Sequence, residues 1–272
     1  MGVTVGATLR ASGATVVWAS DGRSDATRRR AASAGLVDVG SLAALVAAVD
    51  VVVSVCPPDA AEQVLDGVLA RGFEGTYLDA NAIAPERAHA LAARAERAGV
   101  RFVDGGIVGP PATAPGTTWL SLSGPEAARL ASAFAAGPLA VDVLGERVGD
   151  ASALKMCYAA FTKGSTALLA AQLATARALG VQAALEAQWE RDEPGSAAGA
   201  AARLRRVTAK AWRFEGEMHE IAATLEAAGL PTGFHQAAAE VYARLAHFKE
   251  GSERPPLEQV LAALASGEPP RD

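Results

Sequence analysis

Short apolar runs alternate with alanine-rich segments of helical periodicity through the first half of the chain. The runs are rich in β-branched residues and lack polar alternation, which is typical of strands buried on both faces. Strand and helix patterns that alternate with short connections predict a parallel sheet covered by helices on both faces. Asp59 is the expected N-cap of one helix, and Pro85 suits the first turn of another. The expected strands cover residues 14–19, 51–56, 76–80, 100–104, 117–123 and 140–144, and the expected helices residues 24–34, 42–49, 59–70, 85–98 and 125–135.

The strand pattern disappears after Asp150. A long helical pattern runs from residue 151 to about residue 179 and ends at Gly180, with Asp150 as its expected N-cap. The sequence therefore predicts a Rossmann-like, doubly wound and mostly parallel α/β domain over residues 1–148, followed by an all-α domain over residues 149–272. Further helices are expected at residues 182–191, 197–228, 233–248 and 257–265, and a frayed tail at residues 267–272.

The first element is predicted to be a helix, at residues 3–10, and not a strand. A dinucleotide-binding βαβ unit begins with a strand, continues through a glycine-rich turn and holds the pyrophosphate at the helix N-terminus. Gly2 and Gly6 lie near the N-terminus of such a helix, and Gly2 is the expected contact to the cofactor. We therefore expect the sequence to begin inside the first βα turn, so that the central first strand is missing. The alternative is a degenerate domain with an altered first strand.

Composition and charge exclude several functions. The chain has 272 residues, of which 50% are hydrophobic, and 25 basic against 30 acidic residues give a net charge of −5. No overall basic field attracts nucleic acid or an anionic membrane. The opening residues lack the apolar core of a secretory signal, and the apolar runs are far shorter than the roughly 18 residues of a membrane span. Cys56 and Cys157, without CxxC spacing, are typical of a reduced cytoplasmic protein without structural zinc.

Hydroxyl and charged residues follow the first expected strand. In a doubly wound fold this strand end meets the adenosine ribose of a dinucleotide. Arg23 with Ser20 and Ser24 favours the 2′-phosphate of NADP, whereas Asp21 favours the free 2′-hydroxyl of NAD. We expect NADP as the cofactor, with NAD as the other possibility, and Arg28 could also reach the phosphate. The alternative is a solvated loop in which Ser24 caps the next helix.

Two further strand ends point to the same edge of the sheet. Cys56 and Pro57 close the strand at residues 51–56, where ligands bind at the topological switch of such sheets. The backbone there can approach a dinucleotide, while the Cys56 side chain is expected to be a small buried group. Asn81 follows the strand at residues 76–80 and could bond the nicotinamide amide or its ribose. A simple turn residue is the alternative for Asn81.

Three stretches carry a family resemblance: DANAIAP at residues 79–85, DGGIVGPP at residues 104–111 with GTTWL shortly after it, and ASALKMCYAAFTKG at residues 151–164. The chain resembles the β-hydroxyacid dehydrogenase superfamily, which includes 3-hydroxyisobutyrate and 6-phosphogluconate dehydrogenases. Within it, the chain is most similar to bacterial phosphogluconate-dehydrogenase-like proteins with a short helical C-terminal domain. The resemblance implies an NAD(P)-binding Rossmann domain and a homodimer built by a helical substrate domain. It also implies a substrate loop with Gly106, Gly109 and Pro110, and Lys155 at the catalytic lysine.

Two positions depart from the family pattern. The serine of the family's substrate loop falls at Val108, and the asparagine one turn beyond the lysine falls at Ala159. Hydrogen-bonding groups for the carboxylate and hydroxyl of a hydroxyacid are therefore missing at both positions. Tyr158 and Thr162 are candidate replacements, and Thr162 shares the helix face of Lys155.

Lys155 also stands out without the resemblance. Its helix is rich in apolar residues, so nearly all of it is expected to be buried. Desolvation lowers the pKa of a buried ammonium, and such a lysine can exchange a proton with a substrate oxygen or nitrogen as hydride moves to or from a nicotinamide. The alternative is a lysine that extends its charged head to water. The apolar residues are Leu154, Met156, Tyr158, Phe161, Leu168 and Leu169.

His235, at an expected helix start after Gly233, is the candidate substrate contact in the helical domain, and a solvent-facing histidine is the alternative. Motifs of zinc proteases, P-loop proteins and serine hydrolases are missing from the sequence, and no metal site is expected. The sequence predicts an NAD(P)-dependent oxidoreductase acting on a small hydroxyacid, ketoacid or related carbonyl, with Lys155 as proton donor or acceptor. The alternatives are an imine-reductase-like enzyme and a non-catalytic regulatory protein that keeps the dinucleotide fold.

Overall fold

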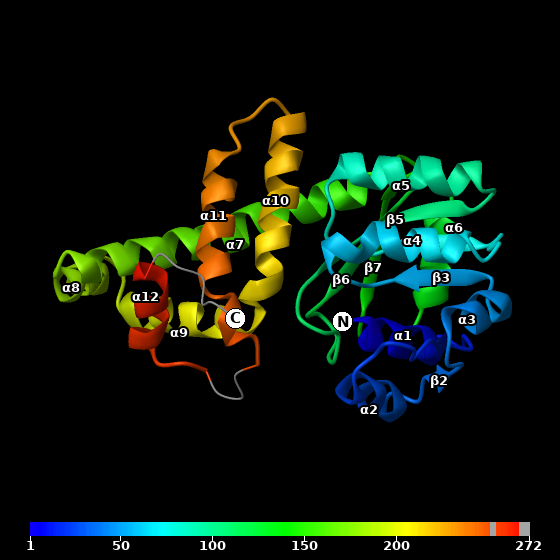
Figure 1. The fold of residues 1–272 in the computed structure, drawn as a ribbon, viewed down its shortest axis with the longest axis horizontal. Coiled ribbons are helices and arrows are strands. Elements are labelled where there is room, and N and C mark those ends of the chain that lie inside the picture. The colour runs from blue at the N-terminus through cyan, green and yellow to red at the C-terminus, as the bar shows by residue number, and fades with distance from the viewer. Residues whose placement is uncertain (251–253, 267–272) are drawn as a thin grey trace. The chain divides into compact units, whose positions relative to one another are not determined.

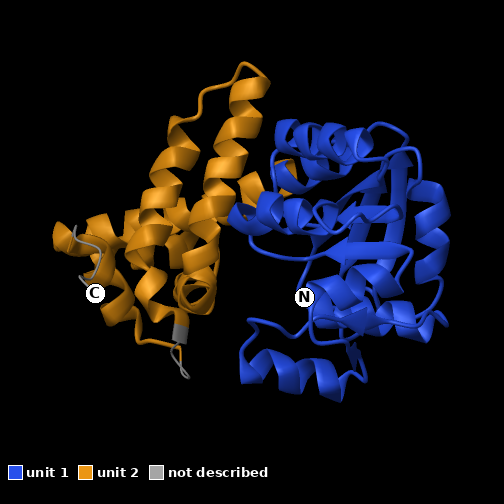
Figure 2. Ribbon diagram, turned by 45° about the vertical axis from the view of Figure 1, so that its right-hand side comes forward, with its two compact units in different colours: residues 1–156 blue, residues 157–272 orange. Residues whose placement is uncertain are grey.

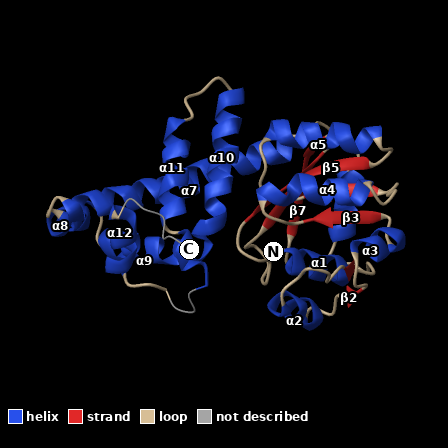
Figure 3. Cartoon of the chain, in the orientation of Figure 1, coloured by secondary structure: helices blue, strands red, loops and turns tan. Residues whose placement is uncertain are grey.

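The chain consists of two compact units. The computed structural model describes residues 1–250 and 254–266. Contacts divide the chain into Met1–Met156 and Cys157–Asp272, as Figure 2 shows. In the described residues, strands occur only in the first unit (Figure 3). The predicted boundary after residue 148 marks the start of the long helix α7 (Asp150–Ala178), whereas the contacts divide the chain within that helix.

The first unit contains a five-stranded sheet. The strand order is β3 (Val51–Ser54), β4 (Thr76–Asp79), β5 (Arg101–Val108), β6 (Trp119–Ser123) and β7 (Ala140–Gly145). Figure 1 labels these strands except β4. Neighbouring strands are parallel except for β5 and β6, which are antiparallel. The predicted doubly wound, mostly parallel sheet is confirmed. It places the carboxyl ends of β3 and β4 at one edge.

Two short strands form a separate sheet. β1 (Val17–Trp18) pairs in parallel with β2 (Val37–Asp38), and in the described part of the chain no strand joins β1 to β3. The sheet is divided where doubly wound topology places its first strand. β2 was not predicted, because its two residues are exposed and form no apolar run. The expectation about where the sequence begins stays a prediction.

Helices cover both faces of the larger sheet. Successive strand residues point to opposite faces, so Tyr77 and Leu78 of β4 belong to different cores. On one face, Tyr77 stacks with Phe102 at a centroid distance of 6.0 Å, beneath α3 (Leu42–Ala48), α4 (Ala61–Leu69) and α5 (Pro85–Arg97). On the other face, Leu78 packs with side chains of α1 (Gly2–Ala11) and α6 (Ala127–Ala131). This two-sided cover explains the continuous apolar runs of the strands.

Most helix ends agree with the sequence, with three corrections. Pro85 opens α5, as expected, and Ser24 caps α2 (Asp25–Ser33). Asp59 is not an N-cap, because a short 3-10 helix, η1 (Pro58–Ala60), precedes α4 and Ala60 holds the cap position. Another 3-10 helix, η2 (Ser132–Phe134), ends the helix expected at residues 125–135. The N-cap expected at Asp150 is also wrong, since α7 begins at that residue.

The second unit is helical throughout its described residues. Lys163 of α7 binds Glu217 of α10 and lies over the Phe214 ring, at 4.4 Å from its centroid. Phe214 in turn contacts Tyr242 of α11 edge to face, so one buried cluster joins three helices. The single helix expected at residues 197–228 is interrupted by η3 (Thr208–Lys210), and the tail expected at residues 267–272 lies outside the described residues. The other elements are α8 (Gln182–Asp192), α9 (Ser196–Val207), α10 (Ala211–Ala227), α11 (Gly233–Arg244), η4 (Ala246–Glu250) and α12 (Leu257–Ala265).

None of the described helices combines the length and the apolar character that crossing a membrane requires.

Candidate active site at the carboxyl edge of the sheet

Asn81 joins the ends of β3 and β4. Its Oδ1 accepts a hydrogen bond from the Cys56 backbone N–H at 2.6 Å. Its Nδ2 donates to Ser54 Oγ at 3.0 Å and to Asp79 Oδ2 at 2.9 Å. Asn81 is buried, and both of its amide N–H donors are used within the chain. Asn81 therefore stabilises the Cys56 turn, and its expected contact with the nicotinamide or its ribose stays a prediction.

The turn after β3 is shaped by Cys56 and Pro57. Cys56 is partly buried, and burial raises the pKa of its thiol, consistent with a small packing residue. Pro57 is extended and leads directly into η1, whose first residue is Pro58. The two prolines restrict the backbone where a dinucleotide would pass, so this edge can contact a ligand through its shape more than through side-chain chemistry.

Asp79 is a buried carboxyl below this turn. Burial raises its pKa to about 7, and the nearby charge of Asp104 acts in the same direction. Hydrogen bonds from the Asn81 backbone and side chain oppose this rise, as does the positive charge of Arg87. The Asp79 carboxyl, which accepts hydrogen bonds from Asn81, therefore changes its charge near neutral pH.

The N-terminus of α1 lies beside the end of β3. Gly2 opens the helix, Met1 makes no side-chain cap bond, and a Cβ at Gly2 would lie 3.7 Å from Val55 Cβ. The helix dipole places partial positive charge at this end. Gly6 is a packing residue, since a Cβ there would lie 3.2 Å from the Leu36 side chain. The position of Gly2 agrees with its expected contact to a phosphate, which stays a prediction.

A basic group lies at the end of β1. Arg28 Nη1 donates to the hydroxyl of Ser20 at 2.8 Å, and its Nε donates to the Arg23 carbonyl at 3.3 Å. Ser20 is buried, whereas Arg23 is exposed. Ser24 Oγ accepts from Thr27 N–H at 3.4 Å, so its hydroxyl serves as the helix cap that was the alternative to cofactor binding. Arg28, which the sequence analysis named as a further candidate for the phosphate, is thus joined to Ser20 by a hydrogen bond.

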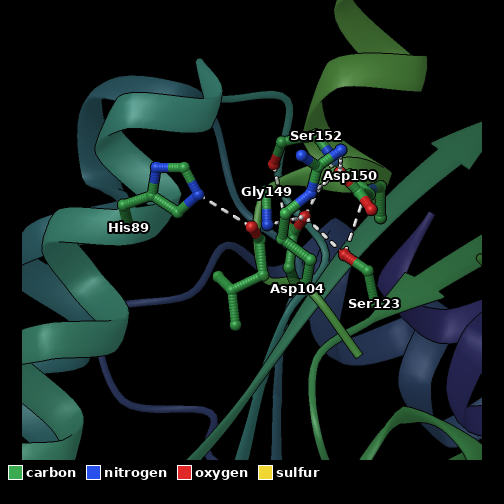
Figure 4. Close-up of polar contacts among 9 residues, drawn as sticks. His89, Asp104, Ser123, Gly149, Asp150 and Ser152 are labelled. Carbon is green, nitrogen blue, oxygen red and sulfur yellow. Dashed lines mark hydrogen bonds and ion pairs between the residues drawn. The ribbon is translucent and has the colours of Figure 1, made fainter. Parts of the chain in front are cut away.

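Asp104 of β5 binds the start of α7, as Figure 4 shows. Its Oδ2 accepts from the backbone N–H groups of Gly149 at 3.0 Å and Ser152 at 2.9 Å, and from Ser123 Oγ at 3.0 Å. Its Oδ1 accepts from Ser152 Oγ at 2.6 Å. Asp104 has no exposed surface, so these bonds replace water around the carboxylate.

Gly106 brings β5 close to Lys155. A Cβ at Gly106 would lie 2.6 Å from the Ala151 carbonyl oxygen and 3.0 Å from Lys155 Cβ. Only a residue without a side chain allows this approach. Lys155 itself is half-buried. Gly106, which was expected to touch the substrate, therefore lies in strand β5 and packs against Lys155.

The loop after β5 is closed by hydrogen bonds and close packing. Gly109 has a φ of +120°, and a Cβ there would lie 2.3 Å from the Thr117 carbonyl oxygen. The Pro110 carbonyl accepts from Thr118 Oγ1 at 2.7 Å. These contacts give Gly109 and Pro110 a backbone role in shaping the loop, and their contact with a substrate stays a prediction.

The long helix α7 is less buried than expected. Met156 and Ala159 are buried, but Leu154 is 44%, Tyr158 50% and Phe161 78% exposed. The expectation that nearly all of this helix is buried is therefore wrong for the single chain. Apolar side chains lie on two sides of α7; among the described residues, the side with Met156 and Ala159 is buried and the side with Leu154, Tyr158 and Phe161 is exposed.

Two predicted substrate residues lie in the helical unit. Thr162 Oγ1 donates to the Tyr158 carbonyl at 3.0 Å, a bond within its own helix. His235 is buried, with its Nε2 3.3 Å from the Ala160 carbonyl oxygen, so the solvent-facing alternative is wrong. The roles of Thr162 and His235 toward a substrate stay predictions.

Two family descriptions match the chain. One, the NAD binding domain of 6-phosphogluconate dehydrogenase, matches residues 1–135, and the other, a domain of unknown function (DUF1932), matches residues 176–245. No curated protein matches the chain.

Solved structures resemble the chain over almost its whole length. A conserved hypothetical protein from Sinorhizobium meliloti 1021 is 25% identical, with 98% of this chain and 93% of that chain covered and a TM-score of 0.67. The 3-hydroxyisobutyrate dehydrogenase of Mycobacterium tuberculosis is 20% identical, with 98% and 96% covered and a TM-score of 0.67. A reductive aminase from Aspergillus terreus in complex with NADPH is 19% identical, with 96% and 94% covered and a TM-score of 0.53. The last two likenesses concern the fold alone.

The mostly parallel sheet and the match of residues 1–135 to an NAD binding domain define a Rossmann-like dinucleotide-binding fold, which is followed here by a helical domain. Within this class, the chain belongs to the β-hydroxyacid dehydrogenase superfamily, as the sequence resemblance implied.

The raised pKa of Asp79 predicts a pH dependence of stability. The folded state keeps the proton up to about pH 7, whereas the unfolded chain releases it near the ordinary aspartate pKa of 3.8. Unfolding therefore releases a proton in this window, so the free energy of unfolding falls as pH rises from about 4 to about 7 and levels off above it. The slope is at most about 1.4 kcal/mol per pH unit.

Urea unfolding across this pH range measures the effect. We expect Asp79→Asn to show a smaller loss of stability with rising pH than the unchanged protein. Asp142→Asn, at an exposed carboxylate of β7, is the control and should keep the original slope. Equal slopes for Asp79→Asn and the unchanged protein would contradict the assignment.

Proposed function

We propose that this protein is an NADP-preferring oxidoreductase that transfers hydride between a nicotinamide and a small hydroxyacid, ketoacid or related carbonyl compound. Lys155 donates or accepts the proton. The observation that carries the proposal is the placement of Lys155 directly against Gly106 of β5, in the unit whose strand ends form the dinucleotide edge. The proposed location is the cytoplasm, where the free thiols of Cys56 and Cys157 stay reduced.

The residues present fit a dinucleotide phosphate chain. The N-terminus of α1, with Gly2 beside Val55, presents backbone N–H groups and the positive end of a helix dipole, which suit a pyrophosphate. Arg28, fixed by Ser20, and the exposed Arg23 suit a phosphate on the adenosine ribose. When bound, the nicotinamide supplies or accepts the hydride.

Lys155 is the group of this chain suited to move the proton. Its stem is fixed by β5, and an amine can exchange a proton with an oxygen or a nitrogen of the substrate. Val108 and Ala159 offer no hydrogen bond at the positions where relatives bind a hydroxyacid. This absence favours testing imines beside hydroxyacids and ketoacids. A non-catalytic protein that binds the dinucleotide is the remaining alternative.

Replacing Lys155 tests the proton role. We expect Lys155→Ala to lower kcat by about 10²- to 10⁴-fold, the usual contribution of a general acid or base. Its Kd for NADPH should stay within about twofold, because the change leaves in place the residues that we propose hold the dinucleotide. Turnover is followed by nicotinamide absorbance with a panel of hydroxyacids, ketoacids and imines.

Lys249→Ala, at an exposed lysine of η4, is the control and should keep full turnover. A Lys155→Ala variant that binds NADPH and turns over at the original rate would refute the proton role. If the unchanged protein binds neither NADPH nor NADH, the proposed enzyme itself is refuted.

Replacing Arg28 tests the cofactor preference. We expect Arg28→Ala to weaken NADPH binding by about 10-fold or more, since hydrogen bonds to charged groups contribute about 1.5–3 kcal/mol. NADH binding should change little, because NADH lacks the 2′-phosphate. Fluorescence titration measures both affinities, with Arg29→Ala, an exposed arginine of the same helix, as the control. An equal loss for both cofactors would contradict the assigned contact.

The exposed side of α7 supports a homodimer. Leu154, Tyr158, Phe161 and Leu168 are between 44% and 78% exposed and, at a spacing of 3–7 residues, lie on one side of the helix. A continuous apolar surface of this kind marks an interface in a soluble protein. We propose that a second copy of the chain covers it.

Phe161→Asp tests the dimer. A charge at the most exposed aromatic residue of this surface is costly to bury, so the variant should be monomeric at concentrations where the unchanged protein is a dimer. Light scattering coupled to gel filtration measures the mass. Leu230→Asp, at an exposed leucine between α10 and α11, is the control and should remain dimeric. A monomeric unchanged protein would refute the dimer.

A further inference from the structure

The hydrogen-bond acceptors for the first turn of α7 are side chains of two strands, β5 and β6. Asp150, the first residue of the helix, forms an ion pair with Arg147 at 2.7 Å. The N–H groups of Gly149 and Ser152 donate instead to Asp104 Oδ2. The N–H of Ala151 donates to Ser123 Oγ at 3.0 Å. Strands β5 and β6 thus supply the acceptors that a helix start needs.

Asp104 is suited to hold this helix firmly. It is buried and accepts four hydrogen bonds, from Gly149, from Ser123 and two from Ser152. A carboxylate at a helix N-terminus also interacts favourably with the helix dipole. Such charge-assisted bonds are shorter and stronger than neutral ones. His89 adds a further contact, with its Nε2 2.7 Å from the Val148 carbonyl oxygen.

The same strand contacts α7 again beside Lys155. Asp104 and Gly106 are two residues apart on β5, so they face the same side. Gly106 touches Ala151 and Lys155, whereas Asp104 binds Ser152, almost one helical turn before the lysine. These two contacts with one strand fix the position of the helical turn along the helix axis and its rotation about that axis. They therefore fix the point from which the Lys155 side chain extends.

We propose that Asp104 is the positioning residue for Lys155: its carboxylate sets the place of the lysine through the first turn of α7. This inference rests on the proposed function, because it assigns Asp104 a part in the same reaction. Asp104 acts through the helix and does not itself bind substrate or cofactor. Its removal should therefore affect the placement of the amine more than the binding of either ligand.

Asp104→Asn tests the proposal, because it keeps the size of the side chain and removes its charge. An amide can accept at one position only, so at least one of the N–H bonds from Gly149 and Ser152 or the bond from Ser152 Oγ is lost. We expect kcat to fall about 10-fold or more, since misplacement by about 1 Å can cost about 10²-fold. KM and the Kd for NADPH should stay within about twofold.

Asp150→Asn is the matched control. It removes the same charge from the same helix end, but Asp150 binds Arg147 and not β5. This variant should keep kcat within about twofold. Ser152→Ala, which removes only the hydroxyl bond to Asp104 Oδ1, should lie between the two and provides a milder variant if Asp104→Asn fails to fold.

Two measurements do not depend on turnover. Hydrogen exchange by mass spectrometry should show faster exchange over residues 149–155 in Asp104→Asn and not in Asp150→Asn. The rate at which an amine-selective acylating reagent modifies Lys155, relative to Lys249 in the same sample, should change several-fold in Asp104→Asn only. Lys249 serves as the internal reference because it is exposed and lies in the other unit.

The outcomes separate this inference from the proposed function. Faster exchange and altered Lys155 labelling support the positioning role even if no substrate has been found. Unchanged exchange and labelling, or equal losses in kcat and NADPH affinity, overturn it. An unchanged protein that binds no dinucleotide refutes the proposed function by itself, whatever the exchange data show.

Discussion

The arrangement of the candidate site depends on the burial of one carboxylate. A charge in the interior of a protein is costly unless hydrogen-bond donors replace the lost water. For Asp104, the start of α7 provides most of these donors. The bonds that solvate the carboxylate are therefore the same bonds that attach the helix to the sheet. Because neither partner is satisfied without the other, strand β5 and the turn that carries Lys155 are held in one arrangement.

The neighbouring strand carries a second buried acid, which has other hydrogen-bond partners. Asp79 and Asp104 are paired across β4 and β5, and both are buried. Asp104 receives donors from a helix start and two serines, whereas Asp79 accepts hydrogen bonds from the backbone and the side chain of Asn81. Desolvation is the largest influence on Asp79 and outweighs these hydrogen bonds, so its pKa is raised to about 7. The carboxyl of Asp79, at the end of β4, therefore titrates near neutral pH.

The sequence predicted the architecture better than the site. Apolar runs located the strands of the main sheet, because strands buried on both faces need them. The two-residue strand β2 was missed, since it is exposed and has no such run. Local rules assigned the cap of α7 to Asp150, but the cap is Asp104, 48 residues before Ser152. Capping rules describe near neighbours in sequence, and a cap supplied by a distant strand follows only from the fold.

The same limit explains why the burial of α7 was overestimated. Its apolar content was correct, but content alone does not tell which chain covers each side. Met156 and Ala159 pack within the chain, whereas Tyr158 and Phe161, on another side of the helix, remain exposed. Exposed apolar residues gathered on one side of a helix are typical of an interaction surface. The exposed apolar residues of the helix that carries Lys155 form the surface that we propose a second copy of the chain covers.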